Sequence, residues 1–318
     1  MWIYVRNRLA SVPLVLVGVI IINFFLNHLS PGDPSNKYFN PQYDQANQLT
    51  LQQKMGLDQP VHIQLGVWFS HFIRGDFGYS WAKNRPVKDI LKEAIPATLQ
   101  LALASLFINF LIGMGAGMWA GVHAKKWAGK TLNSINLLLY SIPSFWLGIF
   151  LIYIFSVRLG WLPASGQSSL ILESTSAFGT FVDRIRHLVM PVVVLGLVGG
   201  AATFRVVRAN TIKTLEEHFI TSARAKGLSP FLILYKHALK NILLPVITLF
   251  GLYFPFLLGG ALVIEIIFAW PGMGRITYDA VMAKDFPIIM AVNYIAAVMV
   301  IIGNFTADIL YRLVDPRI

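Results

Sequence analysis

The chain has 318 residues, of which 56% are hydrophobic and 13% are charged, and its formal net charge is +11. A composition this apolar excludes an ordinary soluble domain and indicates a protein embedded in a membrane. Cysteine is absent, which also excludes disulfides and thiolate metal sites.

Six stretches are apolar enough to cross a bilayer, which takes about 20 residues each. The first is longer than the apolar core of a signal peptide, about 7–15 residues, and no small-x-small cleavage site follows it, so we expect a retained anchor. The fold class predicted is all-α and polytopic. Its six transmembrane helices are expected near residues 9–29, 98–122, 132–157, 188–207, 242–268 and 288–311.

The distribution of Lys and Arg predicts the orientation of these helices. With the N-terminus in the cytoplasm, the cytoplasmic segments and their span ends carry 14 of the 26 basic residues, and the short outer loops carry five. The long loop at 30–97 counts little in this comparison. Both termini are therefore expected to be cytoplasmic. The net positive charge then suits anionic lipid headgroups of the bilayer and requires no nucleic-acid partner.

The first outer loop is expected to hold a small packed element. It opens with a rigid turn at Ser30–Pro34, and the aromatic residues between Trp68 and Trp81 are too dense for a disordered linker. Helical structure is expected over 45–74. An aromatic belt at the membrane interface and contact with an external partner both explain the rings. The chain accordingly divides into 1–97, the first helix with its loop, and 98–318, a five-helix core.

The apolar spans contain regularly spaced glycines and several prolines. Gly113, Gly117 and Gly121 lie four residues apart and so share one face of the second span. That spacing predicts close packing against a neighbouring helix. Pro143 in the third span, and Pro191, Pro245 and Pro255 in later spans, are expected to kink their helices, because proline lacks the N–H that a helix hydrogen bond needs.

Two acidic residues lie within apolar runs, Glu265 in the fifth span and Asp308 in the sixth. A charge at mid-bilayer is costly, so each is a candidate for a gate or for the lining of a path. Both lie near span ends, and snorkelling to water or pairing with Arg275 or Arg312 explains them equally well. Trp270 is a further gate candidate, although an interfacial tryptophan is its ordinary explanation.

The segment Ala124–Thr131 nearly matches a phosphate-binding P-loop. Its first glycine is replaced by Ala124, and it follows a membrane helix instead of a buried strand, so its backbone N–H groups are not expected to surround phosphates. The usual hydrolase and metalloprotease motifs do not occur, and the histidines lack ligand spacing. The sequence predicts no catalytic centre, and any ATP site must lie on another chain.

Residues 208–245 form an ordered segment between two spans. Apolar residues recur at helical spacing as far as Lys226, and Gly227 suits the end of that helix. Ser229 and Pro230 then form an N-cap and a first helical residue, which predicts a second helix. An amphipathic segment lying on lipid headgroups is the simpler interpretation. A Gly-Leu-Ser-Pro corner would break such a helix in its middle, so the sequence favours docking into a cleft of a partner.

Five motifs follow one another along the chain, at Ser30–Pro34, Leu159–Gly166, Ala223–Ser229, Asn241–Pro245 and Ile267–Gly274. Together and in this order they make the sequence resemble the permease subunits of ATP-binding-cassette (ABC) importers. The resemblance is greatest to the dipeptide, oligopeptide and nickel branch, in the subunit type with a long first outer loop. It implies the type I importer permease fold and a multi-pass protein of the bacterial inner membrane.

The resemblance also implies what the residues around the Gly-Leu-Ser-Pro corner do. Residues 212–241 would be the coupling segment, with a coupling helix at 223–235 that docks in a groove of a cytoplasmic ATPase. The family's general motif begins Glu-Ala-Ala, whereas this chain has Thr221, Ser222 and Ala223, and fourteen residues instead of nine separate Gly227 from Ile242. The expected ATPase-coupling residues are Ala223, Arg224, Ala225, Lys226, Gly227, Leu228, Ser229 and Pro230.

The resemblance implies the remaining components as well. They are a second permease subunit, two cytoplasmic ATPases that bind ATP and Mg, and an external substrate-binding protein, so this chain itself is expected to bind no cofactor. Peptides are the expected cargo, with nickel or another small solute as the alternative. A secondary transporter and a polytopic membrane enzyme are rivals of other classes. The first would need coupling-ion sites at mid-bilayer, and neither explains the corner.

Overall fold

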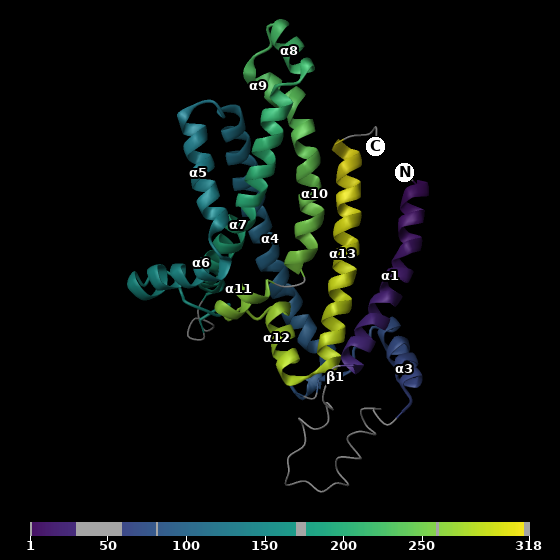
Figure 1. The fold of residues 1–318 in the computed structure, drawn as a ribbon. Coiled ribbons are helices and arrows are strands. Elements are labelled where there is room, and N and C mark those ends of the chain that lie inside the picture. The colour runs from purple at the N-terminus through teal and green to yellow at the C-terminus, as the bar shows by residue number, and fades with distance from the viewer. Residues whose placement is uncertain (1, 30–58, 81, 170–175, 259–260, 315–318) are drawn as a thin grey trace.

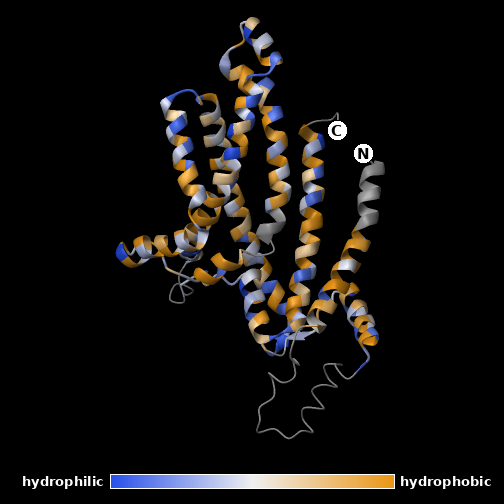
Figure 2. Cartoon of the chain, viewed as in Figure 1, coloured by the Kyte–Doolittle hydropathy of each residue, from blue (hydrophilic) through white to orange (hydrophobic). Residues whose placement is uncertain are grey.

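A computed structural model describes residues 2–29, 59–80, 82–169, 176–258 and 261–314 (Figure 1). Long helices run roughly side by side, and short elements gather at the two ends of the bundle. Hydrophobic residues dominate the long helices, whereas hydrophilic residues gather around α8 at one end and around the small strands at the other (Figure 2). This is the pattern of a helix bundle whose middle faces lipid and whose ends face water.

Four helices are long and apolar enough to cross a membrane. They are α4 (Val87–Val122), α7 (Ala177–Leu215), the continuous run Pro230–Tyr253 and α13 (Phe286–Val314). Two helical segments joined by a bend, Trp127–Ser141 and Ser144–Arg158, make a fifth span if they are counted as one. The helix α1 (Trp2–His28) contributes a shorter apolar stretch, Val12–Leu26. The prediction of an all-helical membrane protein with several spans is confirmed for the described residues.

The predicted third span is broken. It consists of α5 (Trp127–Ser141), α6 (Ser144–Leu151) and the π-helical η2 (Ile152–Arg158), and the chain bends by 95° between α5 and α6. Pro143 stands at the break in an extended conformation, with φ −61° and ψ 134°. Because proline has no N–H to continue the ladder, α6 starts afresh after it. The expected kink at Pro143 is confirmed, and it divides the predicted span 132–157 into two helices. By contrast, α7 continues through Pro191 and α10 through Pro245.

The predicted fifth span also ends early. The helix α10 (Leu239–Leu258) stops ten residues before the expected boundary at 268, and two short helices follow, α11 (Leu262–Ile267) and α12 (Met273–Ala283). These two pack against each other beside the lower part of the bundle (Figure 1). Glu265 therefore belongs to a short separate helix and not to a membrane-spanning one.

The most extensive helix contact joins α4 to α7. A Cβ atom added at Gly113 would lie 2.6 Å from the Cβ of Thr203, and one added at Gly121 would lie 2.6 Å from the Cβ of Thr211. At Gly117 the obstacle is backbone, the carbonyl oxygen of Phe204 at 2.8 Å. The predicted close packing of the three glycines is confirmed, and α7 is the neighbour.

A small element packs at the end of the bundle opposite α8. It contains α3 (Val61–Ile73) and an antiparallel pair of two-residue strands, β1 (Tyr79–Ser80) and β2 (Arg85–Pro86). Phe72 of α3 is buried against Ile20 of α1 and Met290 of α13. The expected packed, partly helical element is confirmed within the described residues. The turn at Ser30–Pro34 and the helical expectation before residue 59 lie outside them.

Candidate functional site

The segment between α7 and α10 that contains the Gly-Leu-Ser-Pro turn, residues 216–235, is called the corner below. At Gly227 it has the local structure that its sequence predicts. The helix α8 spans His218–Ala225, and Gly227 follows with φ +78° in the left-handed region, where a side chain is strained. The N–H of Gly227 donates to the carbonyl of Arg224 at 2.9 Å, and the N–H of Leu228 to that of Ala223 at 3.4 Å. These are the bonds of a glycine-terminated helix end.

One break in this segment was not predicted. The sequence indicated a single helix as far as Lys226, but α7 ends at Leu215 and α8 begins at His218. The N–H of Glu217 turns back to the carbonyl of Thr214 at 3.2 Å, and Glu217 itself is extended, with φ −68° and ψ 148°. The corner is therefore a separate short helix that turns away from the end of α7 (Figure 1).

After the turn at Gly227, the chain is helical again without further interruption. Ser229 caps α9 (Pro230–Leu232): its Oγ accepts from the N–H of Leu232 at 3.3 Å. Helix η4 (Ile233–Ala238) is a π-helical stretch and leads directly into α10. The predicted N-cap and helix start are confirmed. One continuous helix therefore joins the corner to the middle of the bundle.

The inner face of the corner packs against the two helices that flank it, α7 and α10. Ile220 and Ala223 of α8 are buried in one cluster with Val207 of α7, Ile233 of η4 and Ile242 of α10. Leu228 packs against the same cluster. Buried contacts of this kind rigidify an element, so the corner should move together with α7 and the start of α10.

The outer face of the corner is exposed and carries two aromatic rings. Phe231 is 76% exposed and Tyr235 is 67% exposed, and their rings lie parallel with centroids 6.2 Å apart. Large exposed aromatics beside basic side chains are typical of protein interfaces. Both rings lie within the predicted coupling helix at 223–235, although the coupling residues named individually ended at Pro230. Of the predicted coupling residues, six are exposed: Arg224, Ala225, Lys226, Gly227, Ser229 and Pro230.

Glu265 is completely buried and acts as a helix cap in this structure. Its carboxylate accepts from the Oγ1 of Thr98 at 3.1 Å and from the N–H of Arg275, in the first turn of α12, at 2.9 Å. A Cβ at Gly272 would lie 2.5 Å from the carboxylate, so the glycine makes room for it. Snorkelling of Glu265 and an ion pair with the Arg275 side chain are wrong here: that guanidinium donates to the carbonyl of Ala269.

Trp270 is also completely buried, and its Nε1 donates to the carbonyl of Ala97 at 2.9 Å. The alternative explanation, an exposed tryptophan at the membrane interface, does not fit this burial. Together Glu265 and Trp270 fasten the loop between α11 and α12 to the face of α4. Asp308 lies elsewhere, half-buried in the last two turns of α13, so the three gate candidates do not form one site.

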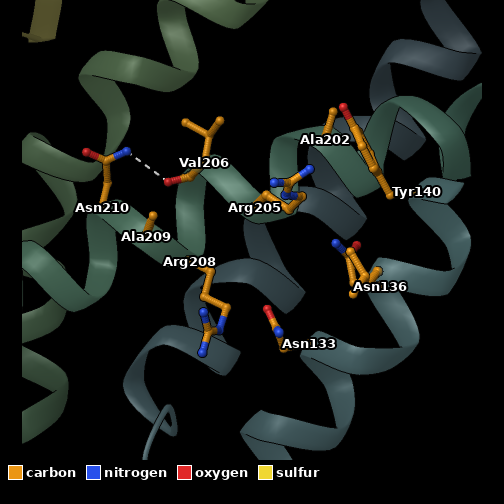
Figure 3. Close-up of a pocket in the computed structure, with 10 residues that line it drawn as sticks. Asn133, Asn136, Tyr140, Ala202, Arg205, Val206, Arg208, Ala209 and Asn210 are labelled. Carbon is orange, nitrogen blue, oxygen red and sulfur yellow. Dashed lines mark hydrogen bonds between the residues drawn. The ribbon is translucent and has the colours of Figure 1, made fainter.

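A polar cavity of about 670 Å³ lies between α5 and α7 (Figure 3). Sequence reasoning counted its two arginines only as orientation signals. The available signal was amide residues at Asn133 and Asn136, three apart at the start of a membrane helix. The cavity is lined by Asn133, Asn136, Leu137, Tyr140, Ala202, Arg205, Val206, Arg208, Ala209 and Asn210.

Models of known protein families match nearly the whole chain. Residues 113–318 match the family of binding-protein-dependent transport system inner membrane components, and residues 1–102 match the model of its N-terminal part. The chain belongs to this family of ABC importer permeases. As a permease subunit it has no catalytic site of its own, and ATP hydrolysis is carried by partner subunits.

Individual relatives and structures agree with this family. An oligopeptide transport system permease of Bacillus subtilis (strain 168), AppB, is 38% identical, over 99% of this chain and 98% of the relative. A glutathione transport system permease of Escherichia coli (strain K12), GsiC, is 36% identical over the same shares. The inward-facing MetNI methionine ABC transporter shares the fold with a TM-score of 0.55 and 19% identity, over 71% of this chain and 97% of that one.

Proposed function

We propose that this chain forms half of the translocation path of an ATP-driven peptide importer. The observation that carries the proposal is the end-to-end match to permeases whose names specify oligopeptide and glutathione transport. Both cargoes are short peptides or peptide-like, so peptides are the cargo class most consistent with the matches. A second permease subunit would complete the path, and an external binding protein would deliver the cargo.

The proposed topology has six spans, with the bent pair α5–α6 as one and α1 as another. The start of α1, the end of α13 and α8 lie toward the same end of the bundle, which supports placing both termini and the corner in the cytoplasm (Figure 1). The excess of Lys and Arg in these segments supports the same orientation in a bacterial inner membrane.

The corner is proposed to be the contact with a cytoplasmic ATPase. Gly227 gives it a tight turn, the buried cluster around Ile220 ties it to α7, and the exposed rings of Phe231 and Tyr235 are available to a groove in the partner. When two ATPases close on ATP, the corner would move with them. The continuous helix from Pro230 would carry that displacement into the bundle and alternate its access.

The sharpest test replaces Gly227 with valine. The φ of +78° is unfavourable for a β-branched side chain, by roughly 1–2 kcal/mol, so the turn should open or shift. Peptide uptake should fall severalfold in proteoliposomes that contain the whole importer, while basal ATP hydrolysis continues. Uptake and hydrolysis are measured on the same preparations.

Gly75→Val is the matched control. Gly75 has a φ of +71° and equally open surroundings, but it lies at the end of α3, at the opposite end of the bundle. It imposes the same kind of backbone strain far from the corner and should leave coupling unchanged. If Gly227→Val transports like the wild type with its ATPases assembled, the corner is not the coupling contact.

A further inference from the structure

The cavity between α5 and α7 has several polar groups along a lining that is otherwise largely apolar. Five of its lining residues carry amide or guanidinium groups, a sixth is a tyrosine, and none is acidic. Both arginines lie in the last third of α7, toward the end that is predicted to be cytoplasmic. The volume of about 670 Å³ suits a small ligand or the end of a peptide.

Its two guanidinium groups come from one face of α7. Arg205 and Arg208 are three residues apart, and both side chains point toward the cavity in Figure 3. Arg205 lies over the ring of Tyr140 on α5, with Cζ 4.6 Å from the ring centroid, which holds its charge in place. Neither arginine takes part in an ion pair among the described residues whose contacts are given.

Arg208 has an unused donor. Its Nε is buried and has no hydrogen-bond partner among the residues that the structure describes. A buried donor without a partner is costly, and a guanidinium most readily satisfies itself with the two oxygens of a carboxylate or phosphate. The cavity therefore offers the positive charge of two guanidinium groups to an oxyanion.

The amides beside the two guanidinium groups can both donate and accept. The Nδ2 of Asn136 donates to the carbonyl of Ala201 at 3.1 Å, and the Nδ2 of Asn210 to that of Val206 at 2.8 Å. Each bond uses one of the two N–H groups of its amide, and each side chain also keeps its amide oxygen as an acceptor. A peptide end carries a carboxylate and N–H donors together, whereas a lipid phosphate carries only acceptors.

We propose that this cavity binds the free C-terminal carboxylate of the cargo during its passage, with Arg205 and Arg208 as the anion ligands. The proposal rests on the proposed function as a peptide importer. The oligopeptides and glutathione named for the relatives share this chemical group. The guanidiniums would hold the carboxylate, and the amide oxygens of Asn136 and Asn210 would accept from the last peptide N–H.

The absence of cysteine allows a direct occupancy measurement. Ala209→Cys places a thiol in the cavity lining, and Ala128→Cys places one on an exposed part of α5 outside it. The whole importer, without nucleotide, is placed in nanodiscs of phosphatidylcholine and labelled with a maleimide. The unsubstituted importer gives the background from its other subunits. The probes are a tripeptide with a free C-terminus and the same tripeptide as its C-terminal amide.

We expect the free acid to slow labelling of Ala209→Cys about tenfold at ten times its half-protecting concentration, and to leave Ala128→Cys unaffected. The amide should need roughly tenfold more for the same protection, since it loses a charge-assisted hydrogen bond. Arg208→Gln should abolish this difference between acid and amide. Lys130→Gln removes an equal charge from an exposed position of α5 and should preserve the difference.

Three results would overturn the proposal: equal protection by acid and amide, equal effects of Arg208→Gln and Lys130→Gln, or protection by anionic lipid alone in nanodiscs with phosphatidylglycerol. ATP-dependent peptide uptake by the wild-type importer with its binding protein is measured in parallel. Uptake without protection refutes the carboxylate site and leaves the proposed function standing. Failure to take up any peptide refutes both.

Discussion

The contact between α4 and α7 should not tolerate even one added methyl group at Gly117. A Cβ there would lie 2.8 Å from the carbonyl oxygen of Phe204 and 3.1 Å from its Cα, both nearer than ordinary van der Waals contact. The obstacle is backbone and cannot rotate away, so the helices must separate by several tenths of an ångström. Overpacking of this kind costs about 1–3 kcal/mol.

The matched variant is Gly115→Ala, two residues away on the same helix. A Cβ at Gly115 meets nothing within 4 Å. Both variants gain the same intrinsic helix preference of alanine, about 1 kcal/mol, so their difference isolates the packing cost. In thermal unfolding of the purified permease pair, Gly117→Ala should melt several degrees below Gly115→Ala. Equal melting temperatures would refute the argument that the glycines set the distance between α4 and α7.

Two further predictions concern buried carboxylates. Glu265→Ala should destabilise the chain by roughly 1–3 kcal/mol, because the Thr98 hydroxyl and a backbone N–H of α12 lose their acceptor, whereas Glu265→Gln keeps an acceptor and should cost less. Thermal unfolding of the two variants checks this order. Burial raises the pKa of the Asp285 carboxyl above its ordinary value, despite the hydrogen bond from the Ser80 hydroxyl at 2.5 Å. The folded state then holds this proton more tightly than the unfolded chain. The stabilising contribution is therefore present below about pH 4, the ordinary value, and is lost as pH rises through the folded value. The stability of the wild type should fall relative to Asp285→Asn across that window, and a constant difference would contradict the assignment.

Features with local causes were predictable from the sequence. Gly227 and the Ser229–Pro230 pair were placed correctly because a left-handed helix end and an N-cap depend on a few neighbouring residues. Pro143 was recognised as a kink for the same reason. The face of Gly113 and its companions followed from helical spacing alone, although the identity of the facing helix did not.

Features that depend on tertiary contacts were not predictable. The run 242–268 is apolar throughout, so hydropathy gave no signal for the end of α10 at Leu258 or for the buried cap that Glu265 provides. The burial of Trp270 depends on Ala97, far away in the sequence. The cavity at Arg208 likewise requires α5 and α7 to be brought together.

These contacts divide the chain into a stiff part and a bending part. The glycine contact joins α4 to α7, the cluster around Ile220 joins the corner to α7, and Trp270 joins the α11–α12 loop to α4. A displacement at the corner is therefore expected to move α4 and α7 as one body. The break at Pro143, where the ladder is already interrupted, is the place where α5 and α6 can change angle. Because the polar cavity lies between α5 and α7, such a change would alter its width, and a bound carboxylate would be held or released with the movement of the corner.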